Sequence, residues 1–421
     1  MYAQVKQVLH SVTFAQSSIT LFGTLINAGL GLIFYILLAR FLGTSSFGIF
    51  SIAIVTLTLI SDIANIGTDT GIVNFVGKYI YSEKPKALKF LKLGLEIKLL
   101  VSVLVIVLGW FFTPLVARYF FAKEELILPL RLSLIGASTA LLFSYATSAI
   151  QAIQKFWLWS FVNIGTNFLR LVTILLLFNL KALTVSASMV TYTTIPLLGF
   201  LIVLYFLPSF WAVKNEKTVA KEFFNYNKWV ALLTLVAALT ARLDTFIATR
   251  FLTLHDVGIY SVANNLAGVV PQIVLAVAVV AAPKLTSFDT KKKAINFLLK
   301  LQLFVFGLCL LGITIGLPIG YLVINYFYSN QYSQSFEPFV ILFLAQLIFL
   351  FSVPVHASIF YYFAKPSFFV LVSFVQLILL LFFGTFLVSH YGYIGASYAV
   401  LLGNVFNLVI PGIWVINKFK K

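Results

Sequence analysis

The chain has 421 residues, of which 61% are hydrophobic and 10% charged, and its formal net charge is +17. Soluble domains hold about 45–50% apolar and about 25% charged residues, so this composition excludes a soluble protein and predicts a polytopic membrane protein. Apolar runs such as 99–108 are nearly continuous and do not alternate every second residue, which favours transmembrane helices over a β-barrel. A basic excess can indicate nucleic-acid binding, but here we expect no nucleic-acid partner.

The expected elements are all helical. Residues 1–16 lack a long apolar core and repeat apolar positions at helical spacing, which predicts an amphipathic segment on the membrane surface. About 20 residues are needed for each span. We expect twelve transmembrane helices, near 17–38, 46–67, 93–113, 131–152, 156–178, 184–207, 228–250, 257–282, 298–327, 338–361, 367–389 and 394–416.

The second half of the chain repeats the first at an offset of 210 residues. Arg40-Phe41-Leu42, Gly48-Ile49 and Ser51 recur as Arg250-Phe251-Leu252, Gly258-Ile259 and Ser261. Two six-helix units repeated in the same orientation are typical of alternating-access transporters. We therefore expect two lobes, 17–213 with the first six helices and 214–421 with the last six, separated by the polar connection 208–228.

Basic residues concentrate in alternate loops, as in Lys291-Lys292-Lys293, and the six Trp residues fall at or just beyond the ends of spans. Cytoplasmic loops carry an excess of Lys and Arg, and Trp favours the membrane interface. We expect both termini in the cytoplasm, in the inner or plasma membrane, with anionic membrane lipids as partners of the basic loops.

Ionisable residues inside spans are costly and mark functional sites. Asp69, Glu96 and Lys98 lie near the expected cytoplasmic end, where an interfacial ion pair also explains them. Arg170 and Arg242 each lie about 14 residues, or about 21 Å, into a helix. Their planar guanidinium groups could grip a diphosphate, or they could pair with a carboxylate such as Asp244 and lock helices together.

Polar residues form stripes at helical spacing on five of the expected helices, those at 17–38, 46–67, 156–178, 228–250 and 257–282. A stripe in lipid should face protein or water, so these positions indicate either a hydrated cleft or polar contacts that hold helices together. The candidate substrate-binding residues are Arg242, Asp244, Arg170, Asp62, Lys98, Asn27, Asn65, Asn265 and Gln272.

No nucleophilic triad, phosphate-binding glycine loop or nucleotide fold is recognisable in the sequence. The single Cys309 excludes disulfides, and the four histidines have no metal-ligand spacing. We expect no enzyme activity, no metal and no cofactor. Energy for transport must then come from an ion gradient, with a proton or sodium as coupling ion at Asp62 or Asp244, or from the substrate gradient itself.

Residues 39–50 and 243–261 resemble the polysaccharide-exporter branch of the multidrug/oligosaccharidyl-lipid/polysaccharide (MOP) superfamily, which includes the O-antigen and capsule repeat-unit flippases. The resemblance extends over the whole chain in length, span count and two-lobe layout. It implies transfer of an undecaprenyl-diphosphate-linked oligosaccharide to the outer leaflet, with polymerase and other assembly proteins as partners. It also implies that Arg242, and more weakly Arg170 and Lys98, hold the diphosphate or acidic sugars.

Three other functions are alternatives to that of a polysaccharide exporter. A drug/cation antiporter of the same superfamily is expected to use cavity carboxylates, but the first helix here has no acid and the deepest charges include two arginines. The peptidoglycan-precursor flippases are expected to have two more C-terminal helices. A membrane-embedded polymerase or ligase is expected to have a large external loop.

Overall fold

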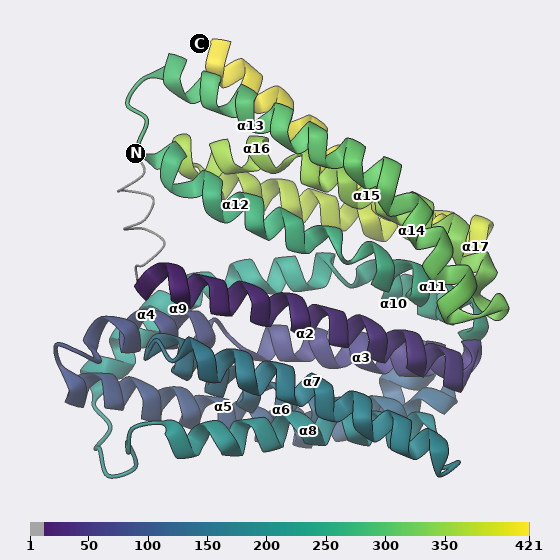
Figure 1. The fold of residues 1–421 in the computed structure, drawn as a ribbon, viewed down its shortest axis with the longest axis horizontal. Coiled ribbons are helices and arrows are strands. Elements are labelled where there is room, and N and C mark those ends of the chain that lie inside the picture. Colours follow the sequence, from purple (N-terminus) through teal and green to yellow (C-terminus); the bar gives the residue numbers. More distant parts are fainter. Residues whose placement is uncertain (1–11, 421) are drawn as a thin grey trace. The chain divides into compact units, whose positions relative to one another are not determined.

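The computed structural model describes residues 12–420 and is built from helices (Figure 1). Eleven helices in the described residues are long and apolar enough to cross a membrane. The last of them, Ser367–Lys420, contains two helices that meet at Gly392, where φ is 61° and ψ is −141°. The described chain therefore has the twelve expected spans, and the all-α prediction is confirmed. Of the amphipathic segment expected at 1–16, residues 1–11 lie outside the described part.

The chain divides into two compact units. Unit 1 comprises Met1–Leu42 and Ala53–Leu235, and unit 2 comprises Gly43–Ile52 and Val236–Lys421. The lobe boundaries expected at 17–213 and 214–421 stay a prediction.

Unit 1 is a bundle whose central helix is α6. Helix α6 packs against α8, α5 and α4, while α2 packs along α7. Its core contains stacked aromatic rings, with the centroids of Phe75 and Phe90 4.6 Å apart. The buried Tyr145 donates its hydroxyl to the carbonyl oxygen of Leu91 at 2.9 Å. The helices are α2 (Val12–Leu42), α3 (Thr44–Ala64), α4 (Thr68–Tyr79), α5 (Lys84–Leu115), α6 (Ile127–Ala152), α7 (Phe156–Asn179), α8 (Val185–Phe206) and α9 (Lys217–Thr240), of which α3 and α9 each continue into unit 2.

In unit 2, the long α17 packs against α15 and α10, and α11 packs against α15. The π-helical segment η6 (Ser358–Tyr362) follows α16. The helices are α10 (Leu243–Phe251), α11 (Leu254–Ala267), α12 (Val270–Thr286), α13 (Lys291–Leu311), α14 (Leu317–Leu322), α15 (Phe336–Phe351), α16 (Val353–Ala357) and α17 (Pro366–Lys420).

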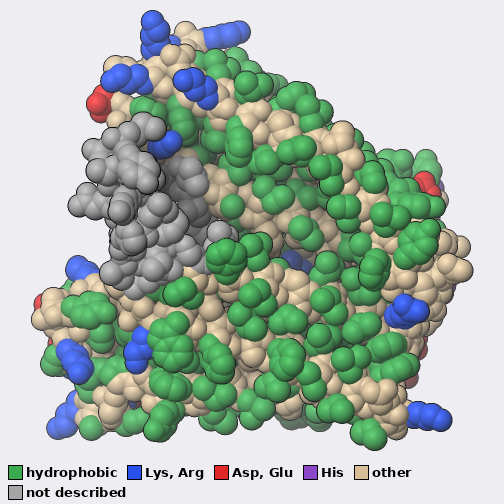
Figure 2. All heavy atoms as spheres, in the orientation of Figure 1, with side chains coloured by type: hydrophobic (Ala, Val, Ile, Leu, Met, Phe, Trp, Pro, Cys, Tyr) green, Lys and Arg blue, Asp and Glu red, His purple; other side chains and the backbone are tan. Residues whose placement is uncertain are grey.

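The outer surfaces of the helices are apolar. Figure 2 shows hydrophobic side chains along the visible helices, with most Lys and Arg side chains near helix ends. Exposed Phe111, Tyr205 and Leu303 are between 72% and 87% exposed, which suits contact with lipid chains.

Four of the expected continuous helices are broken in the structure, including the one expected at 338–361, where Ser352 separates α15 from α16. The span expected at 46–67 ends at Ala64, because Ile66 and Gly67 take φ values of 50° and 71° and a new helix, α4, starts at Thr68. The side-chain oxygen of Asn65 accepts from the Asp69 amide at 3.3 Å and so caps the new helix. The spans expected at 228–250 and 257–282 are also broken, between α9 and α10 and between α11 and α12.

The repeated motif has a structural explanation inside unit 2, where its two copies pack together. A Cβ atom on Gly48 would lie 2.1 Å from the carbonyl oxygen of Leu254. A Cβ atom on Gly258 would lie 2.1 Å from the carbonyl oxygen of Thr44. Because the contact is reciprocal and involves backbone atoms, only glycine fits at either position.

Candidate functional site

The first polar cluster in unit 1 is the Lys98 group, which consists of Asn65, Asp69, Lys98 and Ser144. The Lys98 ammonium lies 2.9 Å from Asp69 Oδ1, and it donates to Asn65 Oδ1 at 2.7 Å and to Ser144 Oγ at 3.0 Å. These residues come from the α3–α4 break, α4, α5 and α6. The helix break thus places an amide oxygen and a carboxylate around one cation.

Burial is unequal within this group. The side chain of Lys98 is 1% exposed, whereas that of Asp69 is 23% exposed. A buried ammonium requires a counter-ion and acceptors for its three protons, and Asp69, Asn65 and Ser144 supply both. The structure therefore favours the ion-pair reading of Lys98 over a free cation awaiting a substrate.

The second cluster is the Arg170 group, which consists of Asn27, Asn167, Arg170 and Tyr192. Arg170 donates to Asn167 Oδ1 at 3.1 Å and to the main-chain oxygen of Tyr192 at 3.0 Å, and its guanidinium lies 3.8 Å from the Tyr192 ring centroid. Asn167 donates in turn to Asn27 Oδ1 at 2.7 Å. The group thereby connects α2, α7 and α8.

Local sequence makes the Tyr192 carbonyl available to Arg170. In a regular helix this oxygen would accept from the amide four residues later, but that residue is Pro196, which has no N–H. Arg170 takes the vacant position. Its Nε is buried and has no hydrogen-bond partner among the described residues.

In unit 2, Arg242 and Asp244 lie at the break between α9 and α10. Arg242 is half-buried and occupies the N-cap position of α10, so it does not lie in the middle of a continuous helix as expected. Asp244 is 6% exposed, and the Tyr260 hydroxyl donates to its Oδ2. Tyr260 is the repeat partner of Phe50, so the two halves differ at this position by one hydroxyl group.

The remaining candidates lie on three other helices. Asp62 is half-buried on α3, Asn265 is half-buried on α11, and Gln272 is exposed on α12. The break between α11 and α12 separates Asn265 and Gln272, which were expected on one stripe. Their assignment as substrate-binding residues stays a prediction.

Three residues of these clusters, Ser144, Tyr192 and Tyr260, were not predicted as site residues. Ser144 and Tyr192 lie on α6 and α8, where no stripe was expected. Pro196 was a usable signal for Tyr192, because it leaves the carbonyl oxygen four residues earlier without a helical donor.

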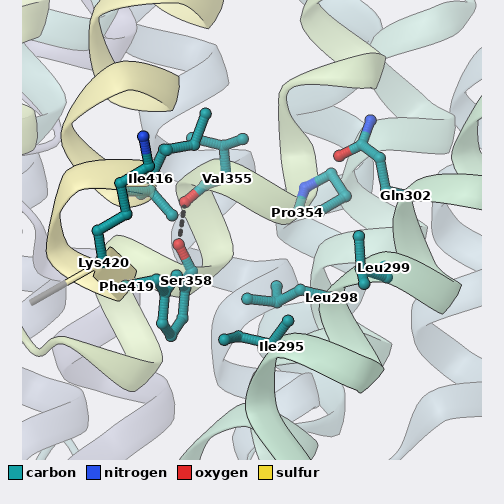
Figure 3. Close-up of a pocket in the computed structure, with 11 residues that line it drawn as sticks. Ile295, Leu298, Leu299, Gln302, Pro354, Val355, Ser358, Ile416, Phe419 and Lys420 are labelled. Carbon is teal, nitrogen blue, oxygen red and sulfur yellow. Dashed lines mark hydrogen bonds between the residues drawn. The ribbon is translucent and has the colours of Figure 1, made fainter. Parts of the chain in front are cut away.

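A cavity in unit 2 is lined by none of the residues of these clusters. It has a volume of about 440 Å³ and is lined by apolar side chains of α13, α16 and α17, including Leu298, Pro354 and Phe419 (Figure 3). Gln302 and Lys420 are the polar or charged side chains drawn there beside Ser358, whose hydroxyl donates to the carbonyl oxygen of Val355 at 2.7 Å. Its lining suits an apolar chain and offers little to a sugar.

A family model described as "Polysaccharide biosynthesis protein" matches residues 14–289, which is more than half of the chain. The chain belongs to this family. A search of curated proteins finds no match. The predicted resemblance to polysaccharide exporters is confirmed at the level of the family.

Solved structures show the fold. An inward-facing multidrug resistance MATE family transporter of the MOP superfamily matches with a TM-score of 0.75 and 13% identity, over 96% of this chain and 97% of that one. The lipid II flippase MurJ, in an inward closed conformation, matches with a TM-score of 0.72 and 15% identity, over 95% and 88%. A MOP superfamily transporter from Pyrococcus furiosus matches with a TM-score of 0.60 and 12% identity, over 96% and 95%. The chain thus belongs to the polysaccharide biosynthesis family and shares its fold with these membrane proteins.

Proposed function

We propose that this protein moves an undecaprenyl-diphosphate-linked oligosaccharide, the repeat unit of an O-antigen, capsule or exopolysaccharide, from the cytoplasmic to the outer leaflet. The observation that carries the proposal is the family match over residues 14–289. The likeness of the fold to a protein named as a lipid II flippase is consistent with the transfer of a lipid across the membrane. We place the protein in the inner or plasma membrane with both termini in the cytoplasm.

The physical requirement is a polar path for the headgroup while the lipid tail stays in the bilayer. The polar clusters within the spans supply hydrogen-bonding groups where lipid supplies none. In the Arg170 group, the unpartnered Nε is a donor that a phosphate oxygen would satisfy once the side chain moves. Arg242 at the α10 N-terminus adds a second guanidinium near a helix end, where backbone amides also favour anions.

A proton- or sodium-coupled drug/cation antiporter is the alternative, and the MATE-like fold is compatible with it. Against it, α2 contains no Asp or Glu, and the Asp69 carboxylate is paired with Lys98. A cationic drug would meet arginines at both candidate positions. The polysaccharide substrate therefore accounts better for the charges.

The test is complementation of a flippase-null strain by Arg242→Ala and Arg170→Ala, measured as surface polysaccharide. Charge-assisted hydrogen bonds contribute about 1.5–3 kcal/mol, so we expect each variant to lose about tenfold or more of activity while still inserting in the membrane. The matched control is Arg118→Ala, because Arg118 pairs with Glu124 on the surface at 3.1 Å. Full activity of both test variants would remove the diphosphate-binding role, and drug resistance without complementation would favour the antiporter.

A further inference from the structure

A third polar cluster, which none of the candidate site residues shares, lies inside unit 2. It is the His356 group, made of Ser352, His356, Gln376 and Asn407. His356 is 8% exposed and belongs to the apolar span Asn330–Tyr362, whereas His255 and His390 are exposed. An ionisable side chain buried in a span needs a reason. We infer that the His356 group is a proton-binding site that couples transport to a proton gradient; this deepens the proposed function and rests on it.

One ring nitrogen of His356 is fixed as a donor. Nε2 lies 2.9 Å from the main-chain oxygen of Asn407, and a carbonyl oxygen only accepts, so Nε2 carries a proton. This carbonyl is available because the residue four positions later is Pro411, which has no amide proton to donate. The sequence of α17 thus supplies an acceptor at the histidine, as Pro196 does for Arg170.

The other ring nitrogen also faces an acceptor. Nδ1 lies 3.3 Å from Ser352 Oγ, whose own proton is directed to the carbonyl oxygen of Phe349 at 2.7 Å. Because the serine proton is already donated to Phe349, the serine oxygen can act only as a hydrogen-bond acceptor towards Nδ1. A second proton on the ring would therefore complete a hydrogen bond that the neutral ring cannot make.

The cluster as a whole lacks one donor. Asn407 Nδ2 donates to Gln376 Oε1 at 3.0 Å, but Asn407 Oδ1 is buried and has no hydrogen-bond partner among the described residues. Asn407 is 5% exposed, so the cost of this unmet acceptor is not relieved by bulk water. The cluster is therefore incompletely hydrogen-bonded in this conformation, which favours a rearrangement that supplies a further donor.

The surroundings make the protonated state unstable unless the helices move. The elements packed against α16 are α12, α13, α15, α17 and η6, and their described residues include a single carboxylate, Glu337. It lies in the first turn of α15, about 22 Å along the helix from Ser352. Phe369 and Phe349 contact the ring with centroids 4.8 Å and 6.0 Å away. The other ionisable groups on these elements are Lys284, Lys291, Lys292, Lys293, Lys300, Cys309, Tyr361, Tyr362, His390, Tyr391, Tyr393, Tyr398, Lys418 and Lys420.

A cationic imidazolium among these groups has no counter-ion, so proton binding favours a conformation in which water reaches the site. The cluster is placed to transmit that change. Ser352 is the residue between α15 and α16, and Gln376 and Asn407 lie in the two parts of α17 on either side of Gly392. A single proton thus acts on three helical segments of unit 2.

The direct test does not depend on the substrate. The variant His10→Gln/His255→Gln/His390→Gln leaves His356 as the only histidine of the full chain, so its isotope-labelled ring can be followed by NMR during a pH titration. We expect the ring signal to shift as a proton binds. Ser352→Ala removes the acceptor at Nδ1 and should move the midpoint of that titration to more acidic pH. A signal that stays unchanged from about pH 4 to about pH 8, or a midpoint unaffected by Ser352→Ala, overturns the proton site.

The transport test uses the full chain in vesicles with a labelled undecaprenyl-diphosphate oligosaccharide and a proton-motive force of about 100 mV imposed entirely as a pH gradient, so that no membrane potential acts on the charged diphosphate. One proton per cycle sustains a leaflet ratio of about 50-fold at that force. We expect His356→Gln to move the lipid but hold a ratio near one, and His390→Gln to keep the wild-type ratio. A wild-type ratio in His356→Gln, or accumulation driven equally by sodium at symmetric pH, contradicts the inference. Absence of lipid movement by the wild-type chain would instead contradict the proposed function.

Discussion

Removing either partner of the Lys98–Asp69 pair should destabilise the protein, and the two losses should be unequal. Loss of one partner from a buried ion pair costs about 3–5 kcal/mol, because the other charge is left without compensation. Asp69→Asn leaves the Lys98 ammonium in a site that is 1% exposed, so we expect a cost in that range. Lys98→Met leaves Asp69, which is 23% exposed and accepts from Ser144 at 3.3 Å, so we expect about 1–2 kcal/mol.

The double variant Asp69→Asn/Lys98→Met removes both charges and should be more stable than Asp69→Asn alone. The assay is equilibrium unfolding in mixed micelles with increasing SDS, followed by circular dichroism. The matched control is the surface pair Lys86–Glu222, 3.2 Å apart and with side chains 29% and 36% exposed, where Lys86→Met should cost about 0–1 kcal/mol. If Lys98→Met costs as much as Asp69→Asn, or if the double variant is the least stable, the reasoning from burial is wrong.

Two further predictions concern packing and pH. Gly258→Ala should lower the free energy of unfolding by about 3 kcal/mol or more, because its Cβ atom would lie 2.1 Å from the Thr44 carbonyl oxygen. Gly412→Ala is the control: a Cβ atom there has no described atom within 4 Å, so this variant should be neutral or slightly stabilising in the same SDS assay. The hydrogen bond from Lys89 lowers the pKa of the exposed Glu216. The contact therefore stabilises the protein at pH values above the ordinary pKa of glutamate, and this stabilisation is lost as the pH falls through the lowered pKa. Limited proteolysis of the connection 207–217 should therefore begin at a higher pH in Lys89→Gln than in the wild type; equal onset would contradict the linkage.

The number and order of the spans were predictable from the sequence because the bilayer imposes a length on every apolar run. The breaks were harder to predict. Asn65 and Gly67 are turn-forming residues and carried a usable signal, but Ala241-Arg242 carried none, since neither residue disfavours a helix. A break of this kind depends on tertiary packing, which overrides local propensity.

The candidate site was predictable as a set of residues but not as a set of contacts. Asn65 and Lys98 were both named from the sequence, yet their 2.7 Å hydrogen bond depends on how the α3–α4 break faces α5. Ser144 has no distinguishing pattern on α6 and was missed. The sequence spacing excluded His356 as a metal ligand but gave no information about proton binding, which needs a single ring and suitable acceptors rather than a set of ligands.

Arg170 and the neutral His356 ring each donate to a carbonyl oxygen that a proline leaves without its helical partner. In a regular span each carbonyl oxygen accepts from the amide four residues later, so a side chain that donates to it has to share that oxygen. Proline removes that amide, and here Pro196 frees the Tyr192 carbonyl for Arg170 while Pro411 frees the Asn407 carbonyl for His356. These backbone oxygens give buried donors a partner inside the spans of a chain that has only 12 acidic residues. Because such an acceptor has no formal charge, it binds the Arg170 guanidinium less firmly than a carboxylate would, so we expect Arg170 to exchange it for a phosphate oxygen more readily.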